Sequence, residues 1–364
     1  MNIIPNKTLA ELTTFRIGGK ASQFVSVATS AELVEALEYA NKNKLEVFIL
    51  GGGSNLLVSD HGFAGLIIQI ALRGKSSVDL GDLVELKVGA GEVWDEVVRH
   101  AVDQQLWGLE NLSNIPGLTG AIPVQNVGAY GQEASQVIKE VEILDRQNFR
   151  ISTLTNNECG FAYRQSHFNT DWKNRFVILS VTFSLHKTGR PNLSYVDVKK
   201  YFEQAGNLNP ALNQIREAII EIRKNKFPDL SLAGCAGSFF KNLLISEEQY
   251  QELESNIRKN FTPEIANKLL EIKNKFPQIG GIKIPTGFLV EICGLKGQTV
   301  GDARLWEKQA LVIVNQGQAT ASDVGQLFNL VRRTVFSKTG AEIMPEPEFV
   351  GFARGELENY FKLT

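Results

Sequence analysis

Residues 234–242, Gly-Cys-Ala-Gly-Ser-Phe-Phe-Lys-Asn, place a serine hydroxyl among small residues, with a cation and an amide directly behind it. Because glycine has no side chain, the two glycines of this segment let a ligand approach the backbone closely. Lys241 and Asn242 supply hydrogen-bond donors that suit an anionic substrate. The segment therefore predicts Ser238 as a reacting group. The alternative is a buried turn in which this serine only caps the chain.

Two glycine-rich stretches precede the serine segment. Gly51-Gly52-Gly53-Ser54-Asn55 follows an apolar run, and successive glycine amides there can bind a diphosphate. The next residues continue as extended chain, so this stretch is not the glycine fingerprint of a dinucleotide-binding fold. The longer stretch, Ile115–Gly131, contains four glycines, two prolines and the amides of Gln125 and Asn126. It suits a loop around a flat polar ligand such as a flavin, and its alternative is a long structural connection.

These motifs and two further ones resemble, in their order, the UDP-N-acetylenolpyruvoylglucosamine reductase family, and the resemblance covers nearly the whole chain. The motifs are Gly51–Asn55, Ile115–Gly117, Gln125–Gly131, Tyr163-Arg164, Ala236–Asn242 and Glu346-Pro347-Glu348. The resemblance, which is to the longer, type I form, implies an α+β fold. In that fold a PCMH-like FAD-binding part of two subdomains precedes a C-terminal α+β substrate-binding domain. It also implies that NADPH, through non-covalent FAD, reduces UDP-N-acetylglucosamine enolpyruvate to UDP-N-acetylmuramate in peptidoglycan precursor synthesis.

The resemblance gives three residues catalytic roles. Ser238 matches the proton donor of the family, Arg164 the arginine near the substrate carboxylate, and Glu346 the C-terminal glutamate. An enol ether accepts hydride poorly unless negative charge at its carboxylate end is stabilised, which a guanidinium fork and a protonated carboxyl can both do. A serine hydroxyl can then donate a proton when neighbouring donors, such as Lys241 or Asn242, stabilise the alkoxide that remains. Each residue has an ordinary alternative, such as a surface ion pair or a solvated carboxylate.

The resemblance also assigns binding residues. Tyr195 matches the tyrosine that closes over the substrate, and Lys226 matches a lysine that contacts the diphosphate, where Asn242 would act with it. Lys241 is also predicted to bind the substrate. The predicted cofactor-binding residues are Gly51, Gly52, Gly53, Ser54, Asn55, Pro116, Gly117, Gln125, Asn126, Gly128, Ala129, Tyr130, Gly131 and Tyr163. No residue is predicted to bind a metal. Cys235 departs from the polar residue that we expect before the serine segment, and we interpret it as a structural thiol because neither neighbour could lower its pKa.

Hydrophobic periodicity predicts the elements that must position these residues. Amphipathic helices are expected near residues 30–40, 93–106, 212–222 and 322–336, and a charged helical insertion, longer than we expect for the family, is expected over Ser246–Lys275. Apolar or β-branched runs predict strands at Val47–Leu50, Leu56–Val58, Gly65–Leu72, Val84–Val88, Val141–Asp145, Arg150–Thr153, Val177–Leu185 and Glu342–Val350. Helices and strands are segregated along much of the chain, as in an α+β protein.

The order of these elements predicts three domains. The first FAD-binding subdomain is expected over residues 1–73, and the tail 342–364 is expected to pack back on it. Residues 73–82 are predicted to form the boundary between the first and second subdomains. The second subdomain is expected over 74–222, and the substrate-binding domain over 223–341. A chain of 364 residues is long enough for two or three such domains.

Composition narrows the class of partner. A net charge of −2 without a long basic run argues against general binding to nucleic acid or anionic lipid. The three cysteines are an odd number with wide spacing, which favours reduced thiols over a disulfide framework. No apolar run reaches the length of a signal peptide core at the start, or of a membrane span elsewhere. We therefore expect a cytoplasmic monomer that acts on small molecules.

Three other functions compete with this interpretation. A serine hydrolase would use Ser238, but the Gly-x-Ser-x-Gly pattern is absent and none of the four histidines has a recognisable triad context. An FAD-dependent oxidase of the same fold, acting on a small alcohol or phenol, would share the two glycine-rich stretches but not the serine segment. A nucleotide-binding regulatory protein would keep those stretches and lose Ser238, Arg164 and Glu346.

Overall fold

A computed structural model describes residues 1–275 and 281–361, which fall into two units. Unit 1 consists of Met1–Lys7, Ala21–Gly53 and Ala64–Asn225, and unit 2 of Thr8–Lys20, Ser54–Phe63 and Lys226–Thr364. Residues 276–280 and 362–364, which belong to the predicted third domain and tail, lie outside the described residues. No helix of the described part combines the length and the apolarity that crossing a membrane requires.

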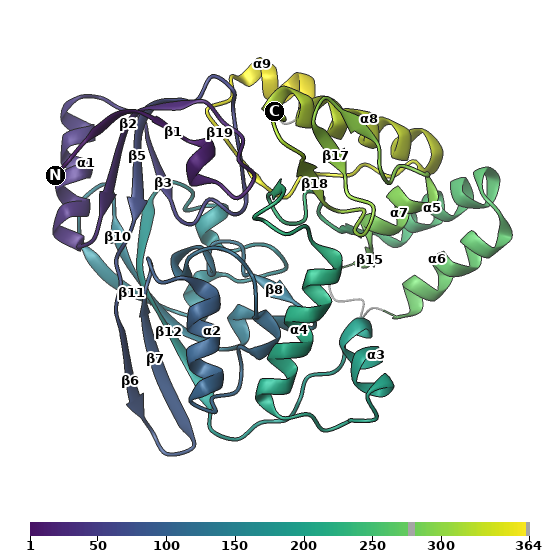
Figure 1. The fold of residues 1–364 in the computed structure, drawn as a ribbon, viewed down its shortest axis with the longest axis horizontal. Helices are drawn as coiled ribbons and strands as arrows, with labels where there is room; N and C mark the ends of the chain where they lie inside the picture. The colour runs from purple at the N-terminus through teal and green to yellow at the C-terminus, as the bar shows by residue number, and fades with distance from the viewer. Residues whose placement is uncertain (276–280, 362–364) are drawn as a thin grey trace. The chain divides into compact units, whose positions relative to one another are not determined.

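The first sheet of unit 1 has the strand order β1-β2-β5-β3. Its strands are β1 (Ile4–Thr8), β2 (Lys20–Val27), β5 (Phe63–Ile70) and β3 (Val47–Leu50). The helix α1 (Ser30–Lys42) begins where Thr29 Oγ1 accepts a hydrogen bond from the Glu32 amide at 3.1 Å. Its predicted apolar stripe is buried, as Leu33, Ala36 and Ala40 are 0 % exposed. The stripe packs in one core with buried side chains of β2 and β5, and Figure 1 shows α1 along this sheet.

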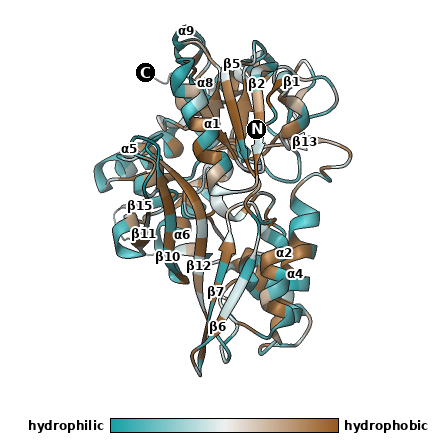
Figure 2. Ribbon diagram, turned by 90° about the vertical axis from the view of Figure 1, so that its left-hand side faces the viewer, coloured by the Kyte–Doolittle hydropathy of each residue, from teal (hydrophilic) through white to brown (hydrophobic). Residues whose placement is uncertain are grey.

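The second sheet of unit 1 is antiparallel, with the order β11-β10-β12-β7-β6. Its strands are β11 (Ile151–Thr155), β10 (Ile138–Asp145), β12 (Phe176–His186), β7 (Leu83–Gly89) and β6 (Lys75–Asp79). Helix α2 (Trp94–Asp103) covers one face, where Trp94 contacts Phe183 of β12 with ring centroids 5.6 Å apart. The other face carries exposed ion pairs such as Lys87–Glu142. Figure 2 shows β12 in brown, in keeping with its nearly continuous buried run.

Strand β6 lies within residues 73–82, which the sequence predicted to be a connecting boundary. All five of its residues are exposed, and its sequence, Lys-Ser-Ser-Val-Asp, has no apolar alternation. It is an edge strand held by backbone pairing with β7, a contact that hydrophobic periodicity does not report.

A smaller core in unit 1 joins α3 (Val196–Gln204) to α4 (Leu212–Lys226). Its buried members are Tyr130, Val198, Phe202, Ile215, Ala218, Ile219 and Ile222. The predicted stripe of α4 therefore packs against the end of the long glycine-rich stretch.

Unit 2 contains a sheet of order β13-β18-β17-β16 and a helical layer. The strands are β13 (Gly234–Cys235), β18 (Ile313–Asn315), β17 (Ala303–Leu305) and β16 (Thr299–Val300), and the helices are α5 (Glu247–Asn260), α6 (Pro263–Lys275), α7 (Thr286–Ile292) and α8 (Ala321–Thr339). Two further pairs are β14 (Leu243–Ile245) with β15 (Ile282–Ile284), and β19 (Glu348–Val350) with β4 (Leu56–Val58). Of the strand predicted over residues 342–350, only the last three residues form a strand, because pairing with β4 begins at Glu348.

The core of unit 2 is built around α8, whose predicted stripe is fully buried. Phe328 of α8 contacts both Phe239 and Phe240 of the serine segment, with ring centroids 5.9 and 5.6 Å apart. The insertion forms α5 and α6, and α5 contributes Asn256, which donates to the carbonyl of Thr339 at the end of α8. The insertion therefore caps and covers the helix that anchors the serine segment.

Short helical turns complete the described fold. The 3₁₀ turns are Ala10–Leu12, Glu110–Leu112, Thr119–Ala121, Ala134–Gln136, Asn157–Cys159 and His167–Asn169, and the chain ends in α9 (Arg354–Glu356) and a π turn, Leu357–Phe361. The cysteines are free, buried thiols. Burial raises the pKa of Cys159 to about 12, and it also raises the pKa of Cys293. Cys235 is 4 % exposed, in keeping with a structural thiol.

Glu110 is a buried carboxyl, 3 % exposed, whose Oε2 accepts a hydrogen bond from the Gly108 amide at 2.7 Å. Burial raises the pKa of Glu110, so the folded state binds its proton more tightly than the unfolded state does. Its contribution to stability is therefore full below the unfolded pKa, about 4.3, and declines as pH rises through the folded pKa. We expect Glu110→Gln, which keeps an acceptor but cannot ionise, to raise the melting temperature by a few degrees at about pH 8 and not at about pH 4. Thermal unfolding at both pH values checks this, and an equal gain at both would contradict it.

Candidate active site

The serine segment is anchored on both sides by the core of unit 2. Strand β13 pairs with β18, and after it Gly237 adopts a φ of 70°, a conformation that favours glycine. A Cβ at Gly237 would meet nothing within 4 Å, so the space beside this turn is open. Phe239 and Phe240, both 1 % exposed, fix the far side of the turn, and Ser238 before them is half-buried. The hydroxyl is thus carried by a rigid turn next to open space.

The structure brings the segment of Glu346 alongside this turn. The Glu346 amide donates to the carbonyl of Phe239 at 2.8 Å, and the Lys241 amide donates to the carbonyl of Met344 at 2.9 Å. Phe240 and Pro345 form a β-bridge between these two bonds. Glu346, like Ser238, is half-buried. Two of the three predicted catalytic residues therefore lie on directly hydrogen-bonded segments of one unit.

Thr286, which the sequence analysis did not single out, holds the residues that follow the serine. Its amide donates to Asn242 Oδ1 at 3.1 Å, and its hydroxyl donates to the carbonyl of Lys241. Thr286 is 0 % exposed and is the first residue of α7. No local pattern identifies it, because its role depends on a contact between distant parts of the chain. The Lys241 side chain is exposed, as a contact for a soluble substrate requires.

The structure also places the other predicted residues of unit 2. The carbonyl of Asn55 accepts a hydrogen bond from the amide of Glu348 at 2.9 Å. Glu348 lies two residues after Glu346 in the chain. Lys226 is half-buried at the end of α4, where its carbonyl accepts from Trp306 Nε1 at 3.0 Å. The side chain of Ser54 is half-buried.

In unit 1 the two glycine-rich stretches meet. A Cβ on Gly52 would lie 2.8 Å from the Cα of Gly117 and 3.2 Å from the amide nitrogen of Leu118. The Gly117 carbonyl in turn accepts a hydrogen bond from the Trp94 amide at 3.0 Å, which fixes this loop to the start of α2. A diphosphate or the edge of a flavin can approach a glycine backbone closely, because no side chain lies between them. The residues present therefore fit an FAD molecule.

Asn126 uses its side chain within the protein. It is 1 % exposed, and its Nδ2 donates to Glu133 Oε2 at 2.9 Å and to the carbonyl of Ala162 at 3.1 Å. These bonds tie the long glycine-rich stretch to the segment that carries Tyr163 and Arg164. Any contact of Asn126 with a cofactor would involve its backbone, whose φ of 44° is unusual for a residue other than glycine.

Arg164 lies against the hairpin formed by β8 (Gly128–Ala129) and β9 (Gln132–Glu133). Its Nη2 donates to the carbonyl of Gly128 at 2.8 Å, and its guanidinium lies 5.4 Å from the centre of the Tyr163 ring. Contacts of this kind restrict the orientation of a guanidinium fork. The remaining predicted residues of this loop, Pro116, Gln125 and Ala129, are half-buried, and Gly131 is exposed.

Tyr195 joins the same group of residues. Its ring packs edge-on against Tyr130, with centroids 5.3 Å apart and planes at 79°. Although Tyr195 is 39 % exposed, partial burial of its hydroxyl, with the Asp197 carboxylate and Tyr163, raises its pKa, so the hydroxyl stays protonated and can donate. Unit 1 thus gathers Gly128, Tyr130, Tyr163, Arg164 and Tyr195.

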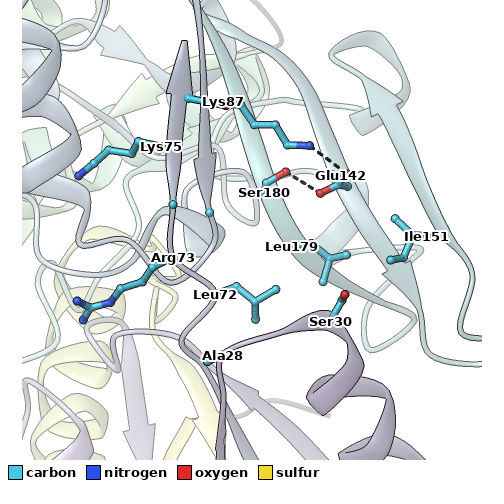
Figure 3. A pocket seen from close by; sticks show the side chains of 13 residues that line it. Ala28, Ser30, Leu72, Arg73, Lys75, Lys87, Glu142, Ile151, Leu179 and Ser180 are labelled. Atoms are coloured by element: carbon cyan, nitrogen blue, oxygen red, sulfur yellow. Dashed lines mark hydrogen bonds and ion pairs between the residues drawn. The ribbon is translucent and has the colours of Figure 1, made fainter.

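A separate surface pocket of about 490 Å³ lies in unit 1 at the polar face of the second sheet (Figure 3). It contains no predicted site residue. Both of its lysines pair with carboxylates, Lys87 with Glu142 at 3.1 Å and Lys75 with Glu92 at 3.4 Å, and Arg73 also lines it. Ser180 also donates to Glu142, as Figure 3 shows. We assign this pocket no part in the chemistry.

Known proteins resemble the chain along nearly its whole length. Residues 229–350 match the family model described as UDP-N-acetylenolpyruvoylglucosamine reductase, C-terminal domain, and residues 21–150 match an FAD binding domain. The reductase of that name from Bdellovibrio bacteriovorus is 37% identical over 95% of this chain and 99% of its own. The one from Flavobacterium johnsoniae is also 37% identical, with the same coverage. The crystal structure of the Thermus caldophilus reductase aligns with a TM-score of 0.63 and 26% identity over 96% of this chain and 98% of that one.

Proposed function

This chain belongs to the UDP-N-acetylenolpyruvoylglucosamine reductase family, and from that premise we propose that it is an NADPH-dependent flavoenzyme that reduces UDP-N-acetylglucosamine enolpyruvate to UDP-N-acetylmuramate. The observation that carries the proposal is the pairing of the Ser238 turn with the Glu346 segment through Phe239 and Phe240. A serine hydroxyl and a carboxyl group thus lie on neighbouring backbone segments, which supports the proposal that they protonate a carbanion beside a carboxylate.

FAD, when bound, supplies a hydride to the terminal carbon of the enolpyruvyl group. We propose that the two glycine-rich stretches of unit 1 hold it, with Gly52 and Gly117 providing the close backbone approach. The chain itself then has two tasks. It must stabilise negative charge on the carboxylate end of the substrate, and it must deliver a proton to the neighbouring carbon.

We assign the first task to Arg164 and Glu346 and the second to Ser238. The guanidinium of Arg164 pairs with the substrate carboxylate, and a protonated Glu346 donates a hydrogen bond as charge develops there. Ser238 donates its proton to the carbanionic carbon, while Lys241 or Asn242 stabilises the alkoxide. We assign Tyr195 to contact with the sugar nucleotide and Lys226 to contact with its diphosphate.

The proposed reaction is tested by its product. Incubation of the purified protein with NADPH and UDP-N-acetylglucosamine enolpyruvate should yield a sugar nucleotide heavier by two hydrogen atoms, identified by mass spectrometry. Turnover of small alcohols or phenols with oxygen, without this product, would instead favour the oxidase.

Gly52→Ala tests where the cofactor binds. The new Cβ would lie 2.8 Å from the Gly117 backbone, so the two loops must separate. We expect FAD to bind at least about tenfold more weakly, measured by the ratio of flavin to protein absorbance after dialysis. Gly355→Ala is the matched control, because a Cβ there meets nothing within 4 Å. Full flavin retention by the Gly52 variant would contradict the assignment.

We also propose that the enzyme works as a cytoplasmic monomer, since its thiols are free and its substrates are small and soluble. Sedimentation at working concentrations tests the oligomeric state.

A further inference from the structure

Three segments of unit 1 converge on Asn111, which is 0 % exposed. Its side-chain amide donates to the carbonyl of Tyr130 at 2.7 Å and to the carbonyl of Asn192 at 3.0 Å. One side chain thus joins the β8–β9 hairpin to the segment that leads into Tyr195. Neither partner is close to Asn111 in the chain.

Asn192 makes a second connection between the same two segments. Its Nδ2 donates to the carbonyl of Gly131 at 2.9 Å, and its Oδ1 accepts hydrogen bonds from the amide and hydroxyl of Ser194 at 3.2 and 2.7 Å. The backbones approach closely here, because a Cβ on Gly131 would lie 2.7 Å from Ser194 Oγ. Residues 192–194 are therefore fixed directly before Tyr195.

The backbone of Asn111 is itself held by a hydrogen-bonded side chain. The Asn111 amide donates to Gln132 Oε1 at 3.1 Å, and Gln132 Nε2 donates in turn to the carbonyl of Gly108. Asn111 is therefore held by its own backbone while its side chain holds two other segments. Removing that side chain would leave two carbonyls without this donor and free the Tyr195 segment on one side.

We infer that Asn111 is a positioning residue that sets the affinity for the sugar nucleotide by fixing Tyr195 against Tyr130. This inference rests on the proposed role of Tyr195 in substrate binding. Asn111 does not touch the reacting atoms. Its effect falls on the binding of the second substrate and leaves NADPH binding and the chemical step unchanged.

The test uses Asn111→Ala and Asn192→Ala, with Asn156→Ala as the matched control. Asn156 also donates through Nδ2 to two backbone carbonyls of unit 1, those of Ser135 and Ile138, at 2.8 and 2.7 Å. Hydrogen exchange of residues 190–195 and steady-state kinetics are measured on the FAD-loaded enzymes. We expect exchange of this segment to rise at least about tenfold in the Asn111 variant, and the KM for UDP-N-acetylglucosamine enolpyruvate to rise about tenfold with kcat changed less than about twofold. Asn156→Ala should change neither quantity in this way.

Unchanged exchange at 190–195 in the Asn111 variant overturns the inference, and so does an equal rise in the Asn156 variant. If hydrogen exchange at 190–195 rises in the Asn111 variant but its KM is unchanged, the link to substrate affinity is overturned. Product formation by the wild-type enzyme decides the proposed function separately. If the wild type forms no product, the reductase proposal fails and the exchange comparison still judges the role of Asn111 in fixing the segment. Should Asn111→Ala not fold, Asn192→Ala, which removes the second connection, decides the same question.

Discussion

Ser238→Ala should leave the reduction of FAD by NADPH unchanged and slow the reaction with the enolpyruvyl sugar nucleotide by about 10²- to 10⁴-fold. The reason is that only the second half-reaction needs a proton at the carbanionic carbon. The turn itself should survive, since it is fixed by Phe239 and Phe240 rather than by the hydroxyl. Anaerobic stopped-flow absorbance measures the two half-reactions separately.

Ser231→Ala is the control for this experiment, because Ser231 is an exposed serine of the same unit, shortly before the serine segment. It should behave as the wild type in both half-reactions. Equal slowing of both half-reactions by Ser238→Ala would make Ser238 a residue of folding or general binding, and the proposed proton donor would have to be sought elsewhere.

Arg164→Lys should lower the rate of sugar nucleotide reduction by about 10²- to 10³-fold, although the charge is conserved. An ammonium group cannot reproduce a two-pronged contact with a carboxylate. It would also lose the geometry by which the guanidinium contacts the Gly128 carbonyl and the Tyr163 ring. Single-turnover kinetics with pre-reduced enzyme measure the effect.

Arg175→Lys is a matched control for this substitution. Arg175 also lies over an aromatic ring, that of Phe176 at 4.7 Å, and it pairs with Asp145, yet it belongs to no predicted site. Arg175→Lys should lower the rate of sugar nucleotide reduction only slightly. If Arg164→Lys retained nearly full activity, a point charge would suffice at this position and the proposed carboxylate fork would be wrong.

Four amphipathic helices and eight strands could be predicted because their signals are local, namely α1, α2, α4 and α8, and β3, β4, β5, β7, β10, β11, β12 and β19. The stripe of α2, from Trp94 to Val102, is at most 3 % exposed, and the stripe of α8 is equally buried. The α+β fold class with an FAD-binding domain is likewise confirmed by the family matches. Strand β6 was missed because it is fully exposed and has only one apolar residue, Val78, and the short β13 depends on pairing with the distant β18. Such pairings leave no periodicity in the sequence.

In the candidate site, too, some features could be predicted from local sequence and others could not. The order of the motifs predicts which residues carry the chemistry, and these roles, like the predicted domain limits, remain predictions. What the sequence could not indicate is how those residues are held. Thr286 supports Asn242, and Asn111 supports the Tyr195 segment, through contacts between parts of the chain that are far apart. A buried polar side chain is identified by its partners, and the partners are known only from the fold.

The most direct test of the central claim is an anaerobic titration of the flavin absorbance of the purified enzyme. The protein should be yellow and should lose its colour when one equivalent of NADPH is added. The colour should return on addition of UDP-N-acetylglucosamine enolpyruvate and should not return with UDP-N-acetylglucosamine. A preparation that cannot take up FAD, or a reduced enzyme that regains its colour only with oxygen, would contradict the claim.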